Sequence, residues 1–320
     1  MTDRSNLALL AVVALLFALS LLAGKVWITP ALWAHDQQAV WIIAQLRLPR
    51  AVLGLAVGAT LGLSGAVLQG YLRNPLADPS LVGISSSAAL GAVSALALGF
   101  GAAPLGLFVS AMVGAMGATT VLLGLTRIDP SPVRFILGGM VLSSLSGALV
   151  AFIISIAPNP FAVAEIVTWL MGALTDRGWD DVIRAAPFMA LGCALLVGSA
   201  RTLDVLSLGS ETAETLGVDL RRLQAMLVLG LGIGVGAAVA ATGVVGFVGL
   251  IVPHVMRALV GERPSALLLP SVLGGAILVL GADSLVRLAP GAGEVRLGVA
   301  MALIGAPFFF LLMWRGARSA

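Results

Sequence analysis

The sequence predicts an all-α membrane protein with about ten transmembrane helices. Hydrophobic residues make up 59% of the chain, charged residues make up only 10%, and the mean hydropathy is +1.08. Soluble domains contain roughly 45–50% apolar and 25% charged residues, which excludes a soluble protein with an unusually apolar core. We therefore expect a single transmembrane domain over residues 1–320, surrounded by membrane lipid.

Long apolar runs define the expected spans. The first run, at 7–24, follows the polar start MTDRSN and lacks a small-residue cleavage site, so we interpret it as an uncleaved helix rather than a signal peptide. The other runs are each about long enough to cross a hydrocarbon core of ~30 Å. Two of them are separated only by Gly243 and Gly246 and are the least distinct. These further spans are expected at 51–70, 81–100, 104–126, 133–157, 182–200, 223–242, 243–260, 266–286 and 296–314.

Two segments between the spans are not expected to cross the membrane. Residues 25–46 contain Lys25, His35 and three tryptophans (Trp27, Trp33 and Trp41), which is typical of a wet segment anchored at the membrane interface. Residues 158–181 predict an amphipathic half-helix at the outer mouth, ending in a charged loop.

Glycines recur four residues apart within the spans. This spacing places them on one face of a helix, where neighbouring helices can approach closely. We expect a packing role for such glycines, among them Gly54, Gly58 and Gly62, and Gly232 and Gly236.

Residues 201–222 form a charged island in an otherwise apolar chain. We expect a short helix from Glu211 to Leu216, with Ser210 as its N-cap and Gly217 as its stop. Ala213 and Leu216 are predicted to lie on one side of it. Because two turns are not stable alone in water, the helix is expected to dock against a partner. The charges are Arg201, Asp204, Glu211, Glu214, Asp219, Arg221 and Arg222.

Basic residues predict that both termini lie in the cytoplasm. With the N-terminus inside, eleven of the 18 Lys and Arg residues face the cytoplasm and seven face outward, as the positive-inside rule favours. The charged island then lies on the cytoplasmic side. The inner residues are Arg4, Arg73, Arg127, Arg134, Arg201, Arg221, Arg222, Arg257, Arg263, Arg315 and Arg318; the outer residues are Lys25, Arg47, Arg50, Arg177, Arg184, Arg287 and Arg296.

The outer arginines Arg47, Arg50 and Arg287 are open to two interpretations. Their side chains could extend to the lipid headgroups. Alternatively, they could form a ring of positive charge that receives an acidic soluble partner outside the membrane.

Several kinds of chemistry are excluded by what the sequence lacks. The sole cysteine, Cys193, leaves no disulfide framework, and no metal site is expected around His35 or His254. Because Lys25 is the only lysine and follows no glycine-rich loop, a phosphate-binding P-loop is impossible. We expect no bound cofactor, no enzymatic activity and no nucleic-acid partner, so any ATP and magnesium would be held by another chain.

Six motifs, in this order, resemble the FecCD-type permeases, which are membrane subunits of type II ABC importers for iron–siderophore complexes, haem and cobalamin. They cover nearly the whole chain and are highly specific in combination. They are RLPR at 47–50, GATLGLSGAVLQGYLRNPLADPSLVGIS at 58–85, SLGSETAETLGV at 207–218, TGVVGFVGLIVPHVMR at 242–257, GADSLVR at 281–287 and GEVRLGVAMALIGAPFFFLL at 293–312.

The resemblance implies the type II importer permease fold in a bacterial inner membrane. It further implies a homodimer, two cytoplasmic ABC ATPase subunits and a periplasmic substrate-binding protein. By motif, Arg47, Arg50 and Arg287 match arginines that dock the binding protein. The residues that match the ATPase-coupling helix are Leu208, Ser210, Glu211, Ala213, Leu216 and Gly217. The residues that match positions near the cytoplasmic gate are Asn74, Leu76, Pro132 and Val133. At the last two positions some family members have small hydroxyl residues instead.

The function expected from the resemblance is ATP-driven import of an iron chelate, either a siderophore complex or haem. Import of cobalamin is the alternative within the family. An ATP-independent secondary transporter is the alternative of another class. That class usually carries ionisable residues deep in the membrane, whereas 81–126 and 223–256 contain no Asp, Glu, Lys or Arg, and Asp283 is the one deeply placed candidate.

Overall fold

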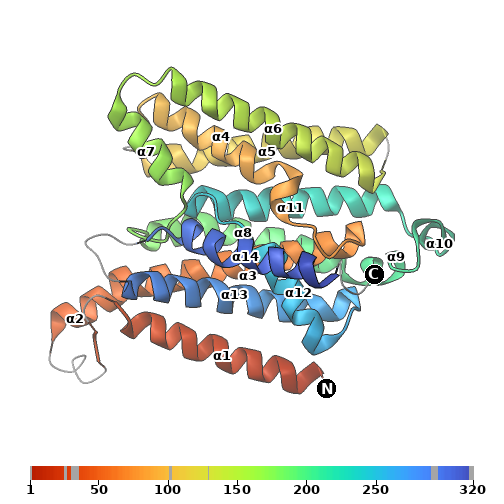
Figure 1. Cartoon of the computed structure of the whole chain (residues 1–320), viewed down its shortest axis with the longest axis horizontal. Coiled ribbons are helices and arrows are strands. Elements are labelled where there is room, and N and C mark those ends of the chain that lie inside the picture. The colour runs from red at the N-terminus through yellow and green to blue at the C-terminus, as the bar shows by residue number, and fades with distance from the viewer. Residues whose placement is uncertain are drawn as a thin grey trace.

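Seven helices of the computed structural model are long and apolar enough to cross a membrane. The structure describes residues 2–24, 27–29, 36–100, 103–128, 130–289 and 295–316. The long helices lie side by side (Figure 1), and at 1.5 Å per residue each spans ~30 Å or more. They are α1 (Thr2–Leu22), α3 (Leu48–Leu72), α5 (Pro104–Ile128), α6 (Pro132–Ser155), α8 (Trp179–Gly198), α11 (Leu220–Thr242) and α13 (Pro264–Leu288).

Shorter apolar helices account for the other three predicted spans. These are α4 (Ile84–Ala97), α12 (Val248–Val260) and α14 (Leu297–Gly316). The break predicted near Gly243 and Gly246 is present, because α11 ends at Thr242 and α12 begins at Val248. The predicted half-helix is α7 (Pro160–Leu170), whose first turn is capped by the Asn159 side chain. All ten predicted spans therefore correspond to helices.

The segment before the second span differs from the prediction. Residues 37–72 are one continuous apolar helical stretch, in which α2 (Gln37–Ile42) and the π-helical turn η2 (Ile43–Arg47) lead directly into α3. Asp36 starts this stretch by accepting a hydrogen bond from the Gln38 backbone N–H. The predicted wet segment 25–46 is thus helical from residue 37; Lys25, Trp33 and His35 lie outside the described residues.

Glycines bring α3 and α13 into backbone contact. A Cβ atom added to Gly58 or Gly62 would overlap backbone atoms of α13 at Gly275 or Ser271. Such contacts let two helices pack without side chains between them. The packing role predicted for the spaced glycines is confirmed here, and also at Gly232, which fits against Thr119 of α5.

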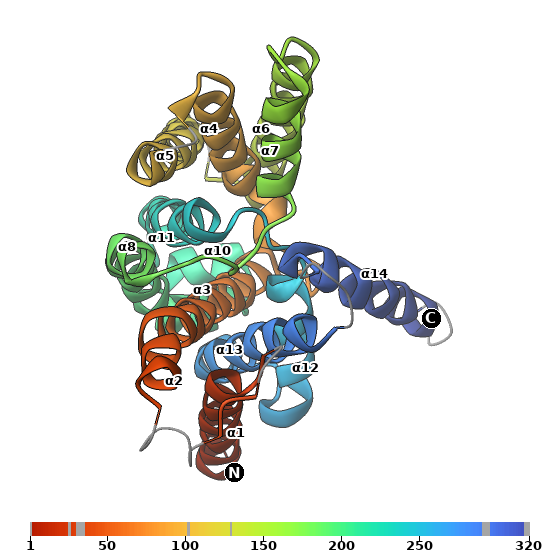
Figure 2. The ribbon, with the colours of Figure 1, turned by 90° about the vertical axis from the view of Figure 1, so that its left-hand side faces the viewer.

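The helices surround α3 unevenly. Seen along the bundle, α8, α11, α12 and α13 lie around α3, while α4, α5 and α6 form a group on one side and α1 lies at the opposite edge (Figure 2). Only 11% of the apolar window is buried in α1 and in α6. These two helices therefore present broad apolar surfaces to lipid or to a partner.

Helix α14 projects from the bundle and is attached through its first half (Figure 2). The Gly298 backbone N–H donates a hydrogen bond to the Gly172 carbonyl oxygen at 3.2 Å, and Met301 is fully buried. Gly305 receives the ring of Phe247, leaving no room for a Cβ atom. Beyond this point, residues 306–312 are exposed or half-buried.

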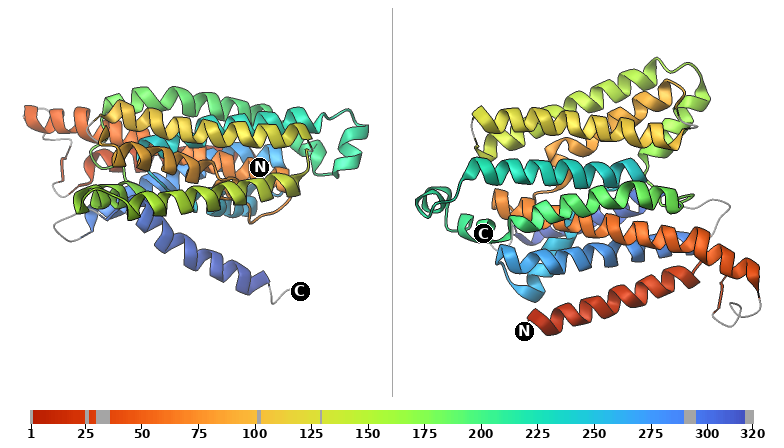
Figure 3. Two further views of the ribbon diagram at one scale, coloured as in Figure 1. Left: turned by 90° about the horizontal axis from the view of Figure 1, so that it is seen from above. Right: turned by 180° about the vertical axis from the view of Figure 1, so that it is seen from behind.

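The two ends of the bundle carry different features. The start of α1, the end of α14 and the short helix α10 (Ser210–Thr215) lie toward one end, whereas α2 and α7 lie toward the other (Figures 1 and 3). The start of α1 and the end of α14 therefore lie on the same side of the bundle as the charged island. We refer to the α10 end as the inner end and to the α2 end as the outer end.

Candidate functional site

Two of the three predicted docking arginines, Arg50 and Arg287, meet around an aspartate at the outer end. Arg50, in the first turn of α3, donates through Nε and Nη2 to both carboxylate oxygens of Asp283 on α13, at 2.9–3.1 Å. The exposed fraction is 11% for the Arg50 side chain and 1% for Asp283. A bidentate arginine–carboxylate pair of this kind fixes the relative position of the two helices.

Arg287 shares the same carboxylate and also holds α1. Its Nη2 lies 3.2 Å from Asp283 Oδ2, and its side chain is 5% exposed. The guanidinium donates to the Ser20 carbonyl oxygen at 2.9 Å, to the Ala23 carbonyl oxygen at 3.1 Å and to Ser20 Oγ at 2.6 Å. Arg287 therefore ties the end of α1 to α13.

Arg47 completes the cluster from η2. Its Nη1 donates to the carbonyl oxygens of Leu21 and Leu22, at 2.9 and 2.7 Å. These carbonyls belong to the last turn of α1, where no intrahelical partner remains and the helix dipole favours a cation. We call Arg47, Arg50, Asp283 and Arg287 the outer charge cluster.

The structure adds a role that neither sequence interpretation anticipated. The three arginines bind groups of their own chain and join α1, α3 and α13; docking of a partner stays a prediction. From the sequence, Asp283 stood out only as an ion-coupling candidate. Its spacing of four residues from Arg287 is a sequence signal for an ion pair within a helix, whereas its pairing with Arg50 spans 233 residues.

At the inner end, the charged island folds into two short helices, α9 (Ala200–Leu206) and α10. Ser210 is the first residue of α10 rather than its N-cap; the N-cap is Gly209, whose φ of +112° suits glycine. The predicted stop is confirmed, since Gly217 has a left-handed φ of +87°. The Val218 N–H donates to the Ala213 carbonyl at 3.0 Å, which closes the helix end.

The exposed face of this segment differs from the predicted one. Ala213 is fully buried and packs inward, so it does not share a surface with Leu216. Leu216 is 62% exposed and Leu208 is 63% exposed, with the exposed Glu211 between them in the chain. Two large exposed apolar side chains in a charged segment indicate a contact surface, which we call the coupling surface (Leu208, Glu211, Leu216).

The predicted gate residues lie on two separate elements. Asn74 Oδ1 accepts a hydrogen bond from the Leu76 backbone N–H at 2.9 Å, which shapes the loop after α3, and Leu76 is 39% exposed. Gln69 Nε2 braces the same loop by donating to the Ala77 and Gly249 carbonyl oxygens at 3.2 and 3.1 Å.

Pro132 and Val133 lie in the first turn of α6 rather than in the turn before it. Proline is favoured at this position because its missing N–H has no partner there. Val133 is 66% exposed, so the helix start presents an apolar rather than a hydroxyl side chain.

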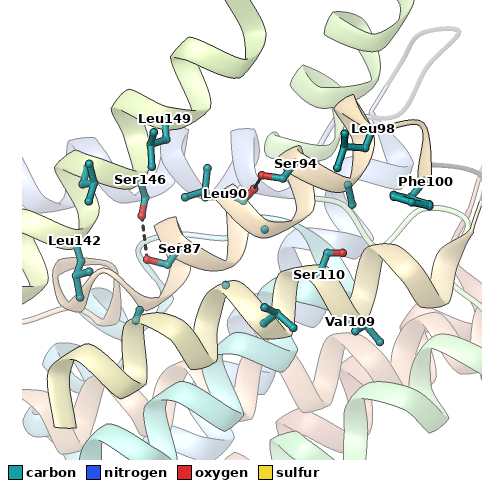
Figure 4. A pocket seen from close by; sticks show the side chains of 16 residues that line it. Ser87, Leu90, Ser94, Leu98, Phe100, Val109, Ser110, Leu142, Ser146 and Leu149 are labelled. Atoms are coloured by element: carbon teal, nitrogen blue, oxygen red, sulfur yellow. Dashed lines mark hydrogen bonds between the residues drawn. The ribbon is translucent and has the colours of Figure 1, made fainter. Parts of the chain in front are cut away.

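The structure also contains a cavity that the sequence did not reveal. It has a volume of about 510 Å³ and lies between α4, α5 and α6. Figure 4 shows leucine and valine side chains around it, with the hydroxyls of Ser87 and Ser146 3.0 Å apart in one wall. Its lining carries no charged side chain among the described residues, which favours an apolar occupant.

The architecture is that of a membrane protein with many helices. The described residues contain no group of three or more His, Cys, Asp and Glu residues able to hold a metal ion. They instead form a many-spanning helical bundle with charged contact regions at its two ends. Bundles of this kind are typical of membrane transport proteins.

The chain belongs to the FecCD transport family, whose model matches residues 10–315. It is 41% identical over 286 residues to the cobalamin import system permease of Halobacterium salinarum, covering 89% of this chain and 76% of that protein. It is 38% identical over 316 residues to the vitamin B12 import system permease of Klebsiella pneumoniae, covering 97% of this chain and 92% of that protein.

A solved structure shares the fold. That structure, described as "an inward-facing conformation of a putative metal-chelate type ABC transporter", superposes with a TM-score of 0.90 at 34% identity, covering 98% of this chain and 99% of that one. The all-α type II importer permease fold expected from the sequence is thereby confirmed. The chain is a membrane permease of the ABC importer class.

Proposed function

We propose that this chain is the membrane permease of an ATP-driven cobalamin importer. The observation that carries the proposal is the identity of 38–41% to permeases named for cobalamin or vitamin B12 import. From the sequence motifs, the expected substrate was an iron chelate and cobalamin was the alternative. The names of the relatives favour cobalamin over an iron chelate. Cobalamin is itself a cobalt chelate, so the structural likeness to a metal-chelate type transporter is consistent with it.

The proposed machine contains two copies of this chain in the bacterial inner membrane, with both termini in the cytoplasm. Two ATPase subunits would bind the coupling surfaces at the inner end, and a periplasmic binding protein would dock at the outer charge cluster. The apolar surface of α6 and the projecting α14 support a second copy of the chain, because they are broad surfaces that the single chain leaves uncovered.

The mechanism assigns each region a separate task. The binding protein would deliver cobalamin at the outer end. ATP binding would close the two ATPases and displace α10, and that displacement would switch the helices between outward and inward access. Leu216 and Leu208 suit the receiving role because they are exposed on a segment that the bundle holds through the buried Ala213.

Uptake into proteoliposomes tests the proposal. The permease is reconstituted with its ATPase and binding protein, and uptake of labelled cyanocobalamin is compared with that of a ferric siderophore and haem. We expect ATP-dependent uptake of cyanocobalamin and little of the others. Uptake of a ferric siderophore in preference to cyanocobalamin would restore the iron-chelate assignment, and uptake without ATP would favour a secondary transporter.

A further inference from the structure

We infer that Asp204, through its hydrogen bonds to the start of α13, transmits movement of the coupling surface to that helix. We call the contact of Asp204 with Arg263 and Ser265 the α9–α13 joint. This inference rests on the proposed function and extends it by naming a positioning residue that acts through its contacts with Ser265 and Arg263. Asp204 lies in α9, between the bundle and α10, and its carboxylate reaches across to the first turn of α13.

The contacts of Asp204 are short and use both carboxylate oxygens. Oδ1 accepts from the Ser265 backbone N–H at 2.8 Å. Oδ2 accepts from Ser265 Oγ at 2.6 Å and from Arg263 Nε at 2.8 Å. The N–H of Ser265, in the first turn of α13, has no partner within its own helix. Asp204 therefore caps α13 from a different helix, and its negative charge suits a helix N-terminus.

Electrostatics keep this joint charged. Partial burial disfavours ionisation of Asp204, but the hydrogen bonds from Ser265 and the positive charge of Arg263 outweigh it and lower the pKa of Asp204 below its ordinary value. The carboxylate is ionised at neutral pH and makes charge-assisted hydrogen bonds, which are the stronger kind. The Arg263 side chain is 74% exposed, so its ion pair with Asp204 is open to water. The two hydrogen bonds from Ser265 are partly buried and are better shielded from water.

Helix α9 connects this joint to the coupling surface. Leu203 and Leu206 are buried, which seats α9 on the bundle, and three residues (207–209) separate it from α10. A connection this short leaves little slack, so displacement of α10 also displaces Asp204. The start of α13 then follows, because Asp204 holds both a backbone and a side-chain donor of Ser265.

Helix α13 extends from this joint to the outer charge cluster. It packs backbone to backbone against α3 at Gly58 and Gly275, so the two helices form one stiff pair. At its far end, Asp283 binds Arg50 and lies beside Arg287. Asp204 thus binds one end of a helix pair whose other end carries the predicted docking arginines Arg50 and Arg287. Helices α9 and α13, which Asp204 connects, are labelled in Figure 1.

The test uses the complete transporter carrying Asp204→Asn. Asparagine keeps one acceptor but loses the charge and the second oxygen acceptor. We expect the ATPase to co-purify as with the wild type and to hydrolyse ATP, while cargo taken up per ATP hydrolysed falls about tenfold, the factor corresponding to one hydrogen bond to a charged group. Asp204→Glu, which retains the charge, should recover part of the loss.

Controls separate this inference from folding and from the proposed function. Asp180→Asn removes a carboxylate whose side chain is 83% exposed and should leave uptake per ATP unchanged. Wild-type uptake per ATP in Asp204→Asn would overturn the inference, whereas absence of ATP-driven uptake by the wild type would overturn the proposed function. If Asp204→Asn does not fold, Ser265→Ala tests the same joint. A fall of less than tenfold in cargo taken up per ATP hydrolysed would support the inference, and a value equal to that of the wild type would refute it.

Discussion

Replacing Asp283 by asparagine should destabilise the outer end of the bundle. The carboxylate is 1% exposed and faces two guanidinium groups whose side chains are 11% and 5% exposed. The neutral amide would remove the carboxylate charge that both Arg50 and Arg287 face. Removing one partner of a buried ion pair costs roughly 3–5 kcal/mol. In a chain of this size each kcal/mol shifts the unfolding midpoint by about 2 °C, so we expect a decrease of about 6–10 °C.

Thermal unfolding in detergent measures this effect, with a thiol-reactive dye reporting on Cys193. This residue is the sole cysteine, and its Sγ lies 3.5 Å from Thr60 Oγ1, between α8 and α3. Asp180→Asn, at an exposed site, serves as the matched control. The Arg50→Gln, Asp283→Asn double variant should lose less than the sum of the two single variants, because the groups interact. Strictly additive losses, or an Asp283→Asn midpoint within about 1 °C of the wild type, a shift that corresponds to well under 1 kcal/mol, would refute the reasoning.

Three further predictions concern other features of the molecule. Leu216→Arg places a charge on a 62% exposed apolar contact and should abolish ATPase co-purification without preventing membrane insertion; normal co-purification would contradict the coupling assignment. Arg47→Glu should weaken capture of the binding protein, most clearly at low salt, where charges are least screened. Capture equal to that of the wild type would contradict a docking role and leave Arg47 only its role in holding α1. Gly58→Ala forces a methyl group against the α13 backbone and should cost about 1–3 kcal/mol or more. Gly117→Ala, with open space around it, should cost nothing, and equal unfolding midpoints for these two variants would contradict the close helix contact.

Much of the fold follows from local sequence patterns. Apolar runs of membrane-spanning length located the spans, and spaced glycines marked the close-packing face of α3, although not the helix that packs against it. The charged island was visible because it places seven charged residues within 22 positions of an apolar chain. These features depend on residues close together in the chain, where periodicity and composition carry the information.

The contacts between distant segments could not be predicted in the same way. Nothing near Arg50 indicates that its partner is Asp283, and nothing near Asp204 indicates Ser265. Local propensity also misplaced Ser210, because serine is a common N-cap, whereas here the left-handed Gly209 ends the preceding turn. The inward position of Ala213 depends on how α10 rests on α9, which is a tertiary property.

The attachment of α14 has a mechanical consequence. Its first half is clamped by Gly298, Met301 and Gly305, and Pro307 follows only two residues later. Proline cannot donate the backbone hydrogen bond that stiffens a helix interior. The remaining residues form an arm about 15 Å long at 1.5 Å per residue, ending toward the same end as α10. Bending at Pro307 would swing the tip of this arm while the clamped turns keep their packing, so the inner end of the chain can change shape without rearrangement of its core.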